Sequence, residues 1–123
     1  MKWIALVTGG VAGTVARYAL SGFVHRFTAS DFPYGTLAVN LAGCLIIGFL
    51  SALSDEKFLL GSNGRLLLMA GFCGAFTTFS TFMLETGNLI RDGETLRAFG
   101  NVAGSVAAGF LLFRLGILLA ELL

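Results

Sequence analysis

The sequence predicts an all-α membrane protein built from four transmembrane helices. Of its 123 residues, 56% are apolar and only 12% are charged, and the mean hydropathy is +0.87. Few soluble domains have this composition. Four apolar segments are each long enough to cross a hydrocarbon core of roughly 30 Å. Residues 1–123 are therefore expected to form a single four-helix transmembrane domain, with no separate soluble domain.

The first predicted helix covers about residues 3–24. Its apolar run is too long for a cleavable signal peptide and is interrupted by Arg17, so we expect a retained helix. Gly9, Gly13 and Arg17 are spaced by four residues and share one helix face. Because small residues let helix backbones approach closely in lipid, this face is expected to contact another helix.

The second predicted helix covers about residues 35–53, and the fourth covers about residues 98–122. The second carries Asn40 within its apolar run, and the fourth carries Asn101 and Ser105. Polar side chains inside transmembrane segments tend to face a bundle interior or a cavity rather than lipid. Both helices are therefore expected to contribute polar groups to the inside of the protein.

The third predicted helix, about residues 66–90, contains an unusual polar segment. Its residues Gly71–Phe82 include two glycines, four hydroxyl side chains and four phenylalanines. Unpaired polar groups are costly in lipid, so such a segment generally faces protein or a water-filled path. It is the first place in this chain to look for function.

The centre of this helix is expected near Thr78, close to the bilayer midplane. Gly71 and Gly74 lack a β-carbon, and the hydroxyls of Thr77 and Thr78 compete for backbone carbonyls. These features predict that the third helix is broken near the midplane. Carbonyl groups released by a break need a partner, and a bound cation is the usual partner in transporters and channels with interrupted helices.

Five polar residues fall in the membrane half opposite the N-terminus when depth is counted at about 1.5 Å per residue. A single polar vestibule opening toward that side is the simplest interpretation. Two of the five, a cation and an anion, either neutralise each other or contact a ligand directly, and both alternatives remain open. The five residues are Arg17, Asn40, Glu85, Asn101 and Ser105.

A stripe of rings and hydroxyls follows the predicted break. Phe79 and Phe82 are three residues apart, and hydroxyl side chains lie beside them on the same helix. Hydroxyl and amide groups can donate hydrogen bonds to an anion, and the edge of a phenyl ring carries partial positive charge. This set would suit a small, strongly hydrated anion. The alternative is that the rings only pack and the hydroxyls bond to their own helix.

The positive charges show no orientation bias. Membrane proteins normally keep an excess of Lys and Arg in cytoplasmic loops, but here each side carries three. A chain without a bias is expected to insert in both orientations, and the simplest closed assembly is then a homodimer of antiparallel subunits with dual topology. The N-terminal side carries Lys2, Lys57 and Arg65, and the other side carries Arg26, Arg91 and Arg97.

Together these segments resemble the CrcB/Fluc fluoride channels over all four helices. The part that reads Gly-x-x-Thr-Thr-Phe-Ser-Thr-Phe is long and unusual, so it is the most specific. The resemblance rests on the segment Gly35–Cys44, the run Gly71–Phe82 followed by Glu85, the segment Gly13–Tyr18, and Asn101 with Ser105.

The resemblance implies a multi-pass protein of the bacterial cytoplasmic (inner) membrane that exports fluoride passively and reduces its toxicity. It implies an antiparallel homodimer, surrounded by lipid, with two permeation pathways. A structural sodium ion would be held by the backbone carbonyls of Gly74 and Thr77, and Arg17 and Glu85 would belong to the vestibule. The fluoride pathway would be formed by Phe79, Phe82, Asn40, Ser80, Thr81 and Ser105.

Two positions depart from the family pattern. Several members have a tyrosine at the position of Asn101 and a hydroxyl at that of Gly109, and these two departures bear on permeation rate and wetting at those levels.

Three other classes of protein fit the sequence less well. A proton-coupled small multidrug antiporter also has four short helices, but it needs a carboxylate deep in the membrane. The first two predicted helices contain no Asp or Glu, and Glu85 lies near one end of the third. A non-transporting assembly subunit would leave the polar stripe without a purpose. An enzyme is not expected because His25 is the only histidine and no nucleophile–base pair is apparent, and no nucleic-acid partner is expected.

Overall fold

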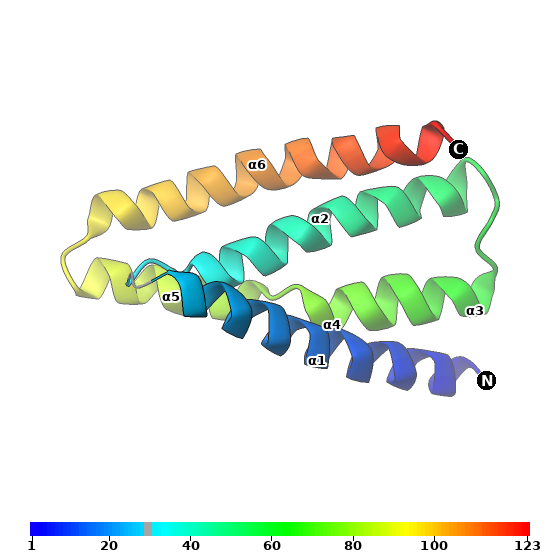
Figure 1. Cartoon of the computed structure of the whole chain (residues 1–123), viewed down its shortest axis with the longest axis horizontal. Coiled ribbons are helices and arrows are strands. Elements are labelled where there is room, and N and C mark those ends of the chain that lie inside the picture. Colours follow the sequence, from blue (N-terminus) through cyan, green and yellow to red (C-terminus); the bar gives the residue numbers. More distant parts are fainter. Residues whose placement is uncertain (29–30) are drawn as a thin grey trace.

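The computed structural model describes residues 1–28 and 31–123 and contains four helical spans. All four are long and apolar enough to cross a membrane, which confirms the predicted all-α class with four transmembrane helices. The spans run side by side, with both termini at the same end of the molecule (Figure 1). They are α1 (Lys2–Phe27), α2 (Tyr34–Asp55), the segmented span Ser62–Arg91, and α6 (Thr95–Glu121).

Most helix ends extend beyond the predicted bounds by one to four residues; the C-terminal end of α6, at Glu121, falls one short. The first helix, for example, was expected to end near residue 24 and continues through His25 and Arg26 to Phe27. Hydropathy marks only the part of a helix that lies in hydrocarbon. Backbone hydrogen bonding can continue past that point, because polar side chains tolerate the headgroup region.

The third span consists of four consecutive segments. α3 (Ser62–Gly64) leads into a π-helix, η1 (Arg65–Cys73), and then into the short α4 (Gly74–Phe76). Thr77 and Thr78 have extended backbone angles, with φ and ψ of −87° and 156° and of −148° and 123°. α5 then runs Phe79–Arg91, and the Thr78 hydroxyl caps it by accepting from the N–H of Thr81 at 3.3 Å.

Glycines bring the helices together in two close pairs. Gly9 and Gly13 of α1 lie against the backbone of η1, where an added β-carbon would collide with the carbonyls of Leu67 and Phe72. This confirms the expected helix contact of that α1 face. Gly48 of α2 and Gly116 of α6 form the corresponding close contact between those two helices. Backbone proximity of this kind is how helices gain packing energy in lipid.

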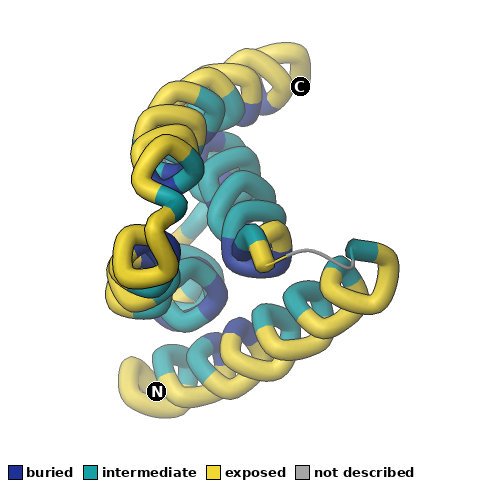
Figure 2. The backbone as a smooth tube through the Cα atoms, turned by 90° about the vertical axis from the view of Figure 1, so that its left-hand side faces the viewer, coloured by how far each residue is buried: buried dark blue, intermediate teal, exposed yellow. Residues whose placement is uncertain are grey.

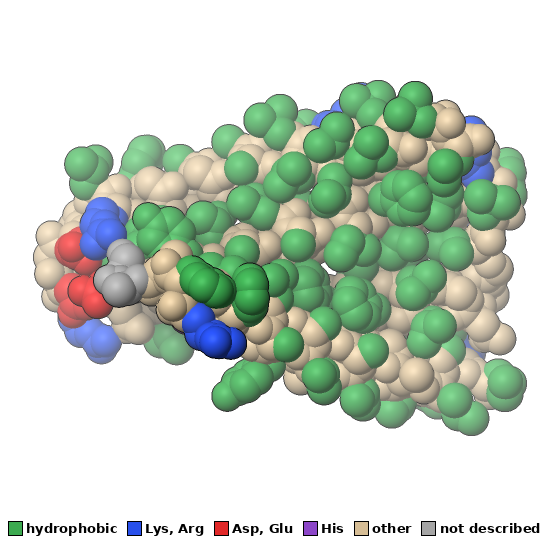
Figure 3. Space-filling view, in the orientation of Figure 1, with side chains coloured by type: hydrophobic (Ala, Val, Ile, Leu, Met, Phe, Trp, Pro, Cys, Tyr) green, Lys and Arg blue, Asp and Glu red, His purple; other side chains and the backbone are tan. Residues whose placement is uncertain are grey.

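The outer surface along the helices is mainly apolar. Figure 2 shows exposed residues along the outward faces of the helices, and Figure 3 shows hydrophobic side chains covering the body of the molecule. Large residues such as Trp3, Tyr18 and Phe110 are 61–84% exposed. This arrangement suits a lipid environment, in which apolar side chains have no reason to turn inward.

Candidate functional site

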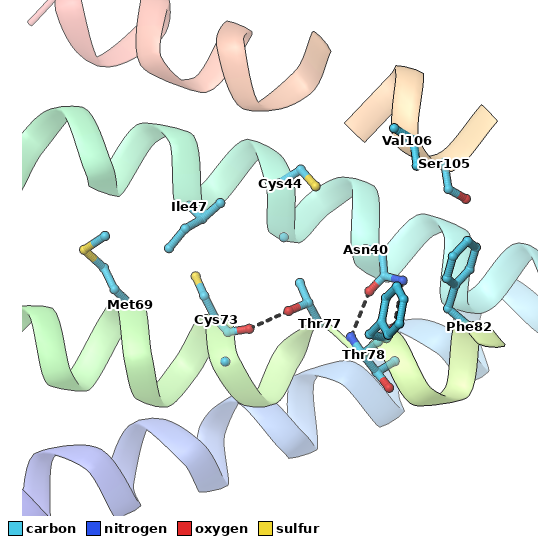
Figure 4. Close-up of a pocket in the computed structure, with 13 residues that line it drawn as sticks. Asn40, Cys44, Ile47, Met69, Cys73, Thr77, Thr78, Phe82, Ser105 and Val106 are labelled. Atoms are coloured by element: carbon cyan, nitrogen blue, oxygen red, sulfur yellow. Dashed lines mark hydrogen bonds between the residues drawn. The ribbon is translucent and has the colours of Figure 1, made fainter. Parts of the chain in front are cut away.

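A cleft of about 470 Å³ lies between α2, the segmented third span and α6; we call it the Asn40 cleft. Figure 4 shows Asn40, Thr77, Thr78, Phe82 and Ser105 around it, contributed by all three elements. Six of the eight residues predicted for the anion pathway or the cation site line this one cleft. They are Asn40, Gly74, Thr77, Phe79, Phe82 and Ser105.

Asn40 connects α2 to the extended residues between α4 and α5. Its side-chain oxygen accepts from the N–H of Thr78 at 2.9 Å, and its Nδ2 donates to the Thr78 carbonyl at 3.1 Å. Only a carboxamide offers an acceptor and a donor in this arrangement. The amide therefore pairs with both the N–H and the carbonyl of Thr78, which lies outside the helical segments. This fixes where α5 begins.

These contacts leave two backbone carbonyls without their usual donors. In an α-helix, Gly74 would accept from the N–H of Thr78, and Thr77 would accept from the N–H of Thr81. The first N–H is bound to Asn40, and the second is bound to the Thr78 hydroxyl. Carbonyl oxygens are suitable ligands for a hard cation. The backbone here therefore fits the predicted carbonyl site at Gly74 and Thr77.

The two phenylalanines of the predicted pathway differ in exposure. The Phe82 side chain is 8% exposed and the Phe79 side chain is 73% exposed, with their ring centroids 6.0 Å apart and the rings tilted by 52°. Phe82 is thus held inside the protomer, whereas Phe79 stands at the edge of the cleft. The open side of Phe79 is available to another molecule or to lipid.

Thr86, one turn after Phe82 on α5, belongs to a hydrogen-bonded chain that sequence analysis missed. Thr86 donates to the Phe82 carbonyl at 2.7 Å, and Asn101 of α6 donates to the Thr86 hydroxyl at 3.0 Å. Asn101 is only 2% exposed and does not line the Asn40 cleft. It therefore joins α6 to α5 rather than wetting a vestibule. The sequence indicates such a role for Thr86 only weakly, by a single hydroxyl four residues after Phe82.

A second cavity of about 340 Å³ lies between α1, α2 and α5; we call it the Arg17 cavity. Arg17, Thr81 and Glu85 line it, together with Thr78, which also lines the Asn40 cleft. Of the five polar residues expected in one vestibule, Arg17 and Glu85 line this cavity, Asn40 and Ser105 line the Asn40 cleft, and Asn101 lines neither. Position along a helix carries no information about which neighbour a side chain faces.

Arg17 and Glu85 do not form an ion pair within the described chain. Arg17 instead donates from Nε to the carbonyl of Ala75 at 3.1 Å, which is another carbonyl released where α4 ends. The Oε1 atom of Glu85 is buried and has no hydrogen-bond partner among the described residues. Two alternatives were open for Arg17 and Glu85: mutual neutralisation or direct contact with a ligand. The structure does not contain mutual neutralisation within one protomer.

Ser80 lies apart from the other predicted pathway residues. Its side chain is exposed, and it lines neither the Asn40 cleft nor the Arg17 cavity. On α5 it points away from both because it follows Phe79 by one residue, which turns it by about 100°. The protomer alone gives Ser80 no role in a pathway.

Four apolar spans with polar cavities between them define a multi-pass membrane protein. The family model described as "CrcB-like protein, Camphor Resistance (CrcB)" matches residues 4–117. The chain belongs to this family.

Curated relatives match along almost the whole chain. A protein of Chlorobaculum tepidum is 53% identical over 123 residues, which cover 99% of this chain and 97% of the relative. A protein of Desulforapulum autotrophicum is 42% identical over 122 residues, covering 99% and 98%. One of Chlorobium phaeobacteroides is 48% identical over 114 residues, covering 93% and 88%. Each of the three is named a fluoride-specific ion channel.

Proposed function

We propose that this protein is a fluoride-selective passive ion channel that lets cytoplasmic fluoride leave the cell and so reduces its toxicity. The observation that carries the proposal is the 53% identity, over 99% of the chain, to a relative named a fluoride-specific ion channel. The proposed location is a bacterial cytoplasmic (inner) membrane. A membrane potential negative inside drives an anion outward, by about 2.3 kcal/mol per charge for each 100 mV.

The Asn40 cleft supports this function because it offers hydrogen-bond donors without a carboxylate. Among the described residues no Asp or Glu lines it, while Asn40, Thr78 and Ser105 supply amide and hydroxyl groups. The Thr77 hydroxyl, which also lines the cleft, already donates to the Cys73 carbonyl at 2.9 Å. α5 begins at Phe79 beside the cleft, and the free N–H groups of a helix start favour negative charge. A small anion could exchange its water shell for these donors and for the ring edges of Phe79 and Phe82.

The absence of a carboxylate in this cleft disfavours the multidrug antiporter. Such an antiporter binds cationic substrates and protons at an embedded acid, whereas Glu85 lies in the Arg17 cavity near a guanidinium. The geometry is better suited to an anion.

We further propose that the channel is an antiparallel homodimer with a structural sodium ion on its two-fold axis. The even distribution of positive charges supports dual topology. Gly74, Phe79 and Ser80 are all exposed in the single protomer, so a second copy could cover them. Two carbonyls from each copy, those of Gly74 and Thr77, would then supply four oxygen ligands to the ion. This assembly would also bring Ser80 and Thr81 into the pathway.

Anion efflux from liposomes tests the proposed function. Purified protein in vesicles loaded with fluoride is expected to release it electrogenically, detected with a fluoride electrode when a potassium ionophore balances the charge. Vesicles loaded with chloride should release little. Chloride efflux at a comparable rate, or fluoride efflux that requires a proton gradient, would contradict the channel proposal.

Replacing Phe82 with isoleucine is expected to lower fluoride flux by about tenfold or more. The change keeps an apolar side chain but removes the ring edge that faces the anion, an interaction of order 1 kcal/mol or more in a desolvated site. Flux per protein in liposomes is the measurement, and Phe79→Ile should behave similarly. As a control, Phe110→Ile on the exposed face of α6 should conduct normally. Normal flux in both the Phe79 and the Phe82 variant would mean that the two rings only pack and do not contact the anion.

A tag after Leu123 is expected on both faces of the membrane, because the charge count gives no preferred orientation. Accessibility of the tag to a membrane-impermeant reagent, in intact and in permeabilised cells, measures the two populations. Adding two lysines to the α2–α3 loop should bias the population to one face and reduce flux, since antiparallel partners would then be scarce. A tag confined to one face in the unmodified protein would defeat the antiparallel dimer.

A further inference from the structure

A separate cavity lies at the end of the molecule that carries the N-terminus. It has a volume of about 510 Å³ and shares no lining residue with the Asn40 cleft or the Arg17 cavity. We call it the Lys2 cavity. It is formed where the start of α1 meets the start of the third span (Figure 1), and it is lined by Lys2, Leu60, Ser62, Arg65 and Leu66.

Two cations from separate segments converge on this cavity. Lys2 begins α1 and Arg65 begins η1, and the hydroxyl of Ser62 lies on the same lining. Together an ammonium, a guanidinium and a hydroxyl offer donors and no fixed negative charge. Phosphate oxygens are the groups that such a set binds best, because guanidinium donors match their geometry.

The acidic side chains at this end do not neutralise the cavity. Asp55 approaches Arg65 only at 3.7 Å, and the two side chains are 67% and 51% exposed, so their attraction is weak. That contact uses few of the five guanidinium donors. Glu56 is engaged with Glu121 of α6, and this hydrogen bond raises the pKa of Glu56 above its usual value.

The position of the cavity decides which phosphate compound it meets. Lys2 and Ser62 are the first residues of two membrane-spanning segments, so the cavity lies at the level of lipid headgroups. Its remaining lining, Leu60 and Leu66, is apolar and half-buried. A lipid presents both features at once, a charged phosphate and the apolar start of its chains.

We propose that the Lys2 cavity binds the headgroup of an anionic phospholipid, with Lys2, Arg65 and Ser62 holding its phosphate and with Leu60 and Leu66 against its glycerol and upper acyl chains. Basic pockets between transmembrane helices recognise anionic lipids in this way. The site shares no lining residue with the Asn40 cleft or the Arg17 cavity, and its test measures lipid retention rather than fluoride flux.

Native mass spectrometry of the full-length protein tests the site. The protein, in detergent, is mixed with equal amounts of phosphatidylglycerol and phosphatidylcholine, and the retained lipids are counted. The wild type is expected to retain about tenfold more phosphatidylglycerol than phosphatidylcholine, because two cations lie near the headgroup. The double variant Lys2→Gln/Arg65→Gln should lose this preference. Unchanged circular dichroism and gel-filtration profiles show that the variant is folded.

A matched double variant controls for net charge. Lys57→Gln/Arg114→Gln removes the same two charges from residues that do not line the cavity, and it should retain the preference for phosphatidylglycerol. An equal loss in both double variants, or no loss in either, would overturn the proposal. So would displacement of the bound lipid by excess inorganic phosphate, because the cavity would then be a site for the free ion.

Discussion

Replacing Gly116 with valine is expected to abolish the folded protein. A β-carbon at this position would collide with the backbone of α2, against the Leu45 carbonyl oxygen and 2.8 Å from the Phe49 nitrogen. Backbone atoms cannot rotate away, so α6 would have to move outward along its contact with α2. Across the same contact, Gly48 meets the carbonyl of Phe113. The contact between α2 and α6 would therefore be lost at both glycines.

The expected cost of Gly116→Val is more than about 3 kcal/mol, since overpacking against side chains alone costs about 1–3 kcal/mol. Size-exclusion chromatography of a fluorescent fusion in detergent should show aggregated material and at least about a tenfold lower yield of folded protein. Gly116→Ala should fall between this variant and the wild type, because it adds one carbon rather than three.

Gly104→Val is the matched control on the same helix. Gly104 has no heavy atom within 4 Å of an added β-carbon, so valine there should leave the folded protomer intact. Equal aggregation of both variants would mean that valine itself is not tolerated in α6. In that case the close approach of α2 would not be the cause.

Replacing Asn40 with leucine is expected to abolish fluoride flux while the protein still folds. Leucine has nearly the same volume but neither donates nor accepts, so the N–H and the carbonyl of Thr78 both lose their partner. An unpaired buried group costs about 1–3 kcal/mol. The start of α5, with Phe79 and Phe82, would shift to find other partners, and the cleft would lose its carboxamide.

A fall of about a hundredfold in fluoride efflux per protein is expected for Asn40→Leu, corresponding to about 2.7 kcal/mol. Asn40→Asp should be equally inactive, because it places a negative charge beside the Thr78 carbonyl and in the path of an anion. Asn63→Leu, at an exposed position on α3, is the control and should conduct normally. Efflux near the wild-type rate in Asn40→Leu would remove Asn40 from both the pathway and the support of α5.

The four spans could be predicted from the sequence because lipid imposes a local requirement. Each helix must satisfy its own backbone and present apolar side chains over the thickness of the bilayer, so length and hydropathy suffice. The contact face of α1 was predictable for the same reason, since Gly9 and Gly13 recur at helical spacing. Composition also marked Gly71–Phe82 as the segment that lipid alone does not explain.

The site could be predicted only in part. Residue type and family resemblance selected six residues that line one cleft in the structure. They are Asn40, Gly74, Thr77, Phe79, Phe82 and Ser105. Asn101 was assigned to a vestibule, but it is buried against Thr86. The sequence gives its position along the helix but not the neighbour that its side chain faces.

By itself, the sequence determined the membrane class, the helices and which polar groups lie within them. Only the tertiary structure decided that Arg17 bonds to Ala75 rather than to Glu85, that Asn101 is bonded to Thr86, and that Asn40 serves both backbone groups of Thr78. The reason is that periodicity specifies a side chain's angle about its own helix axis. The partner it meets depends on how neighbouring helices approach and rotate, and close backbone contacts such as those at Gly48 and Gly116 set those positions.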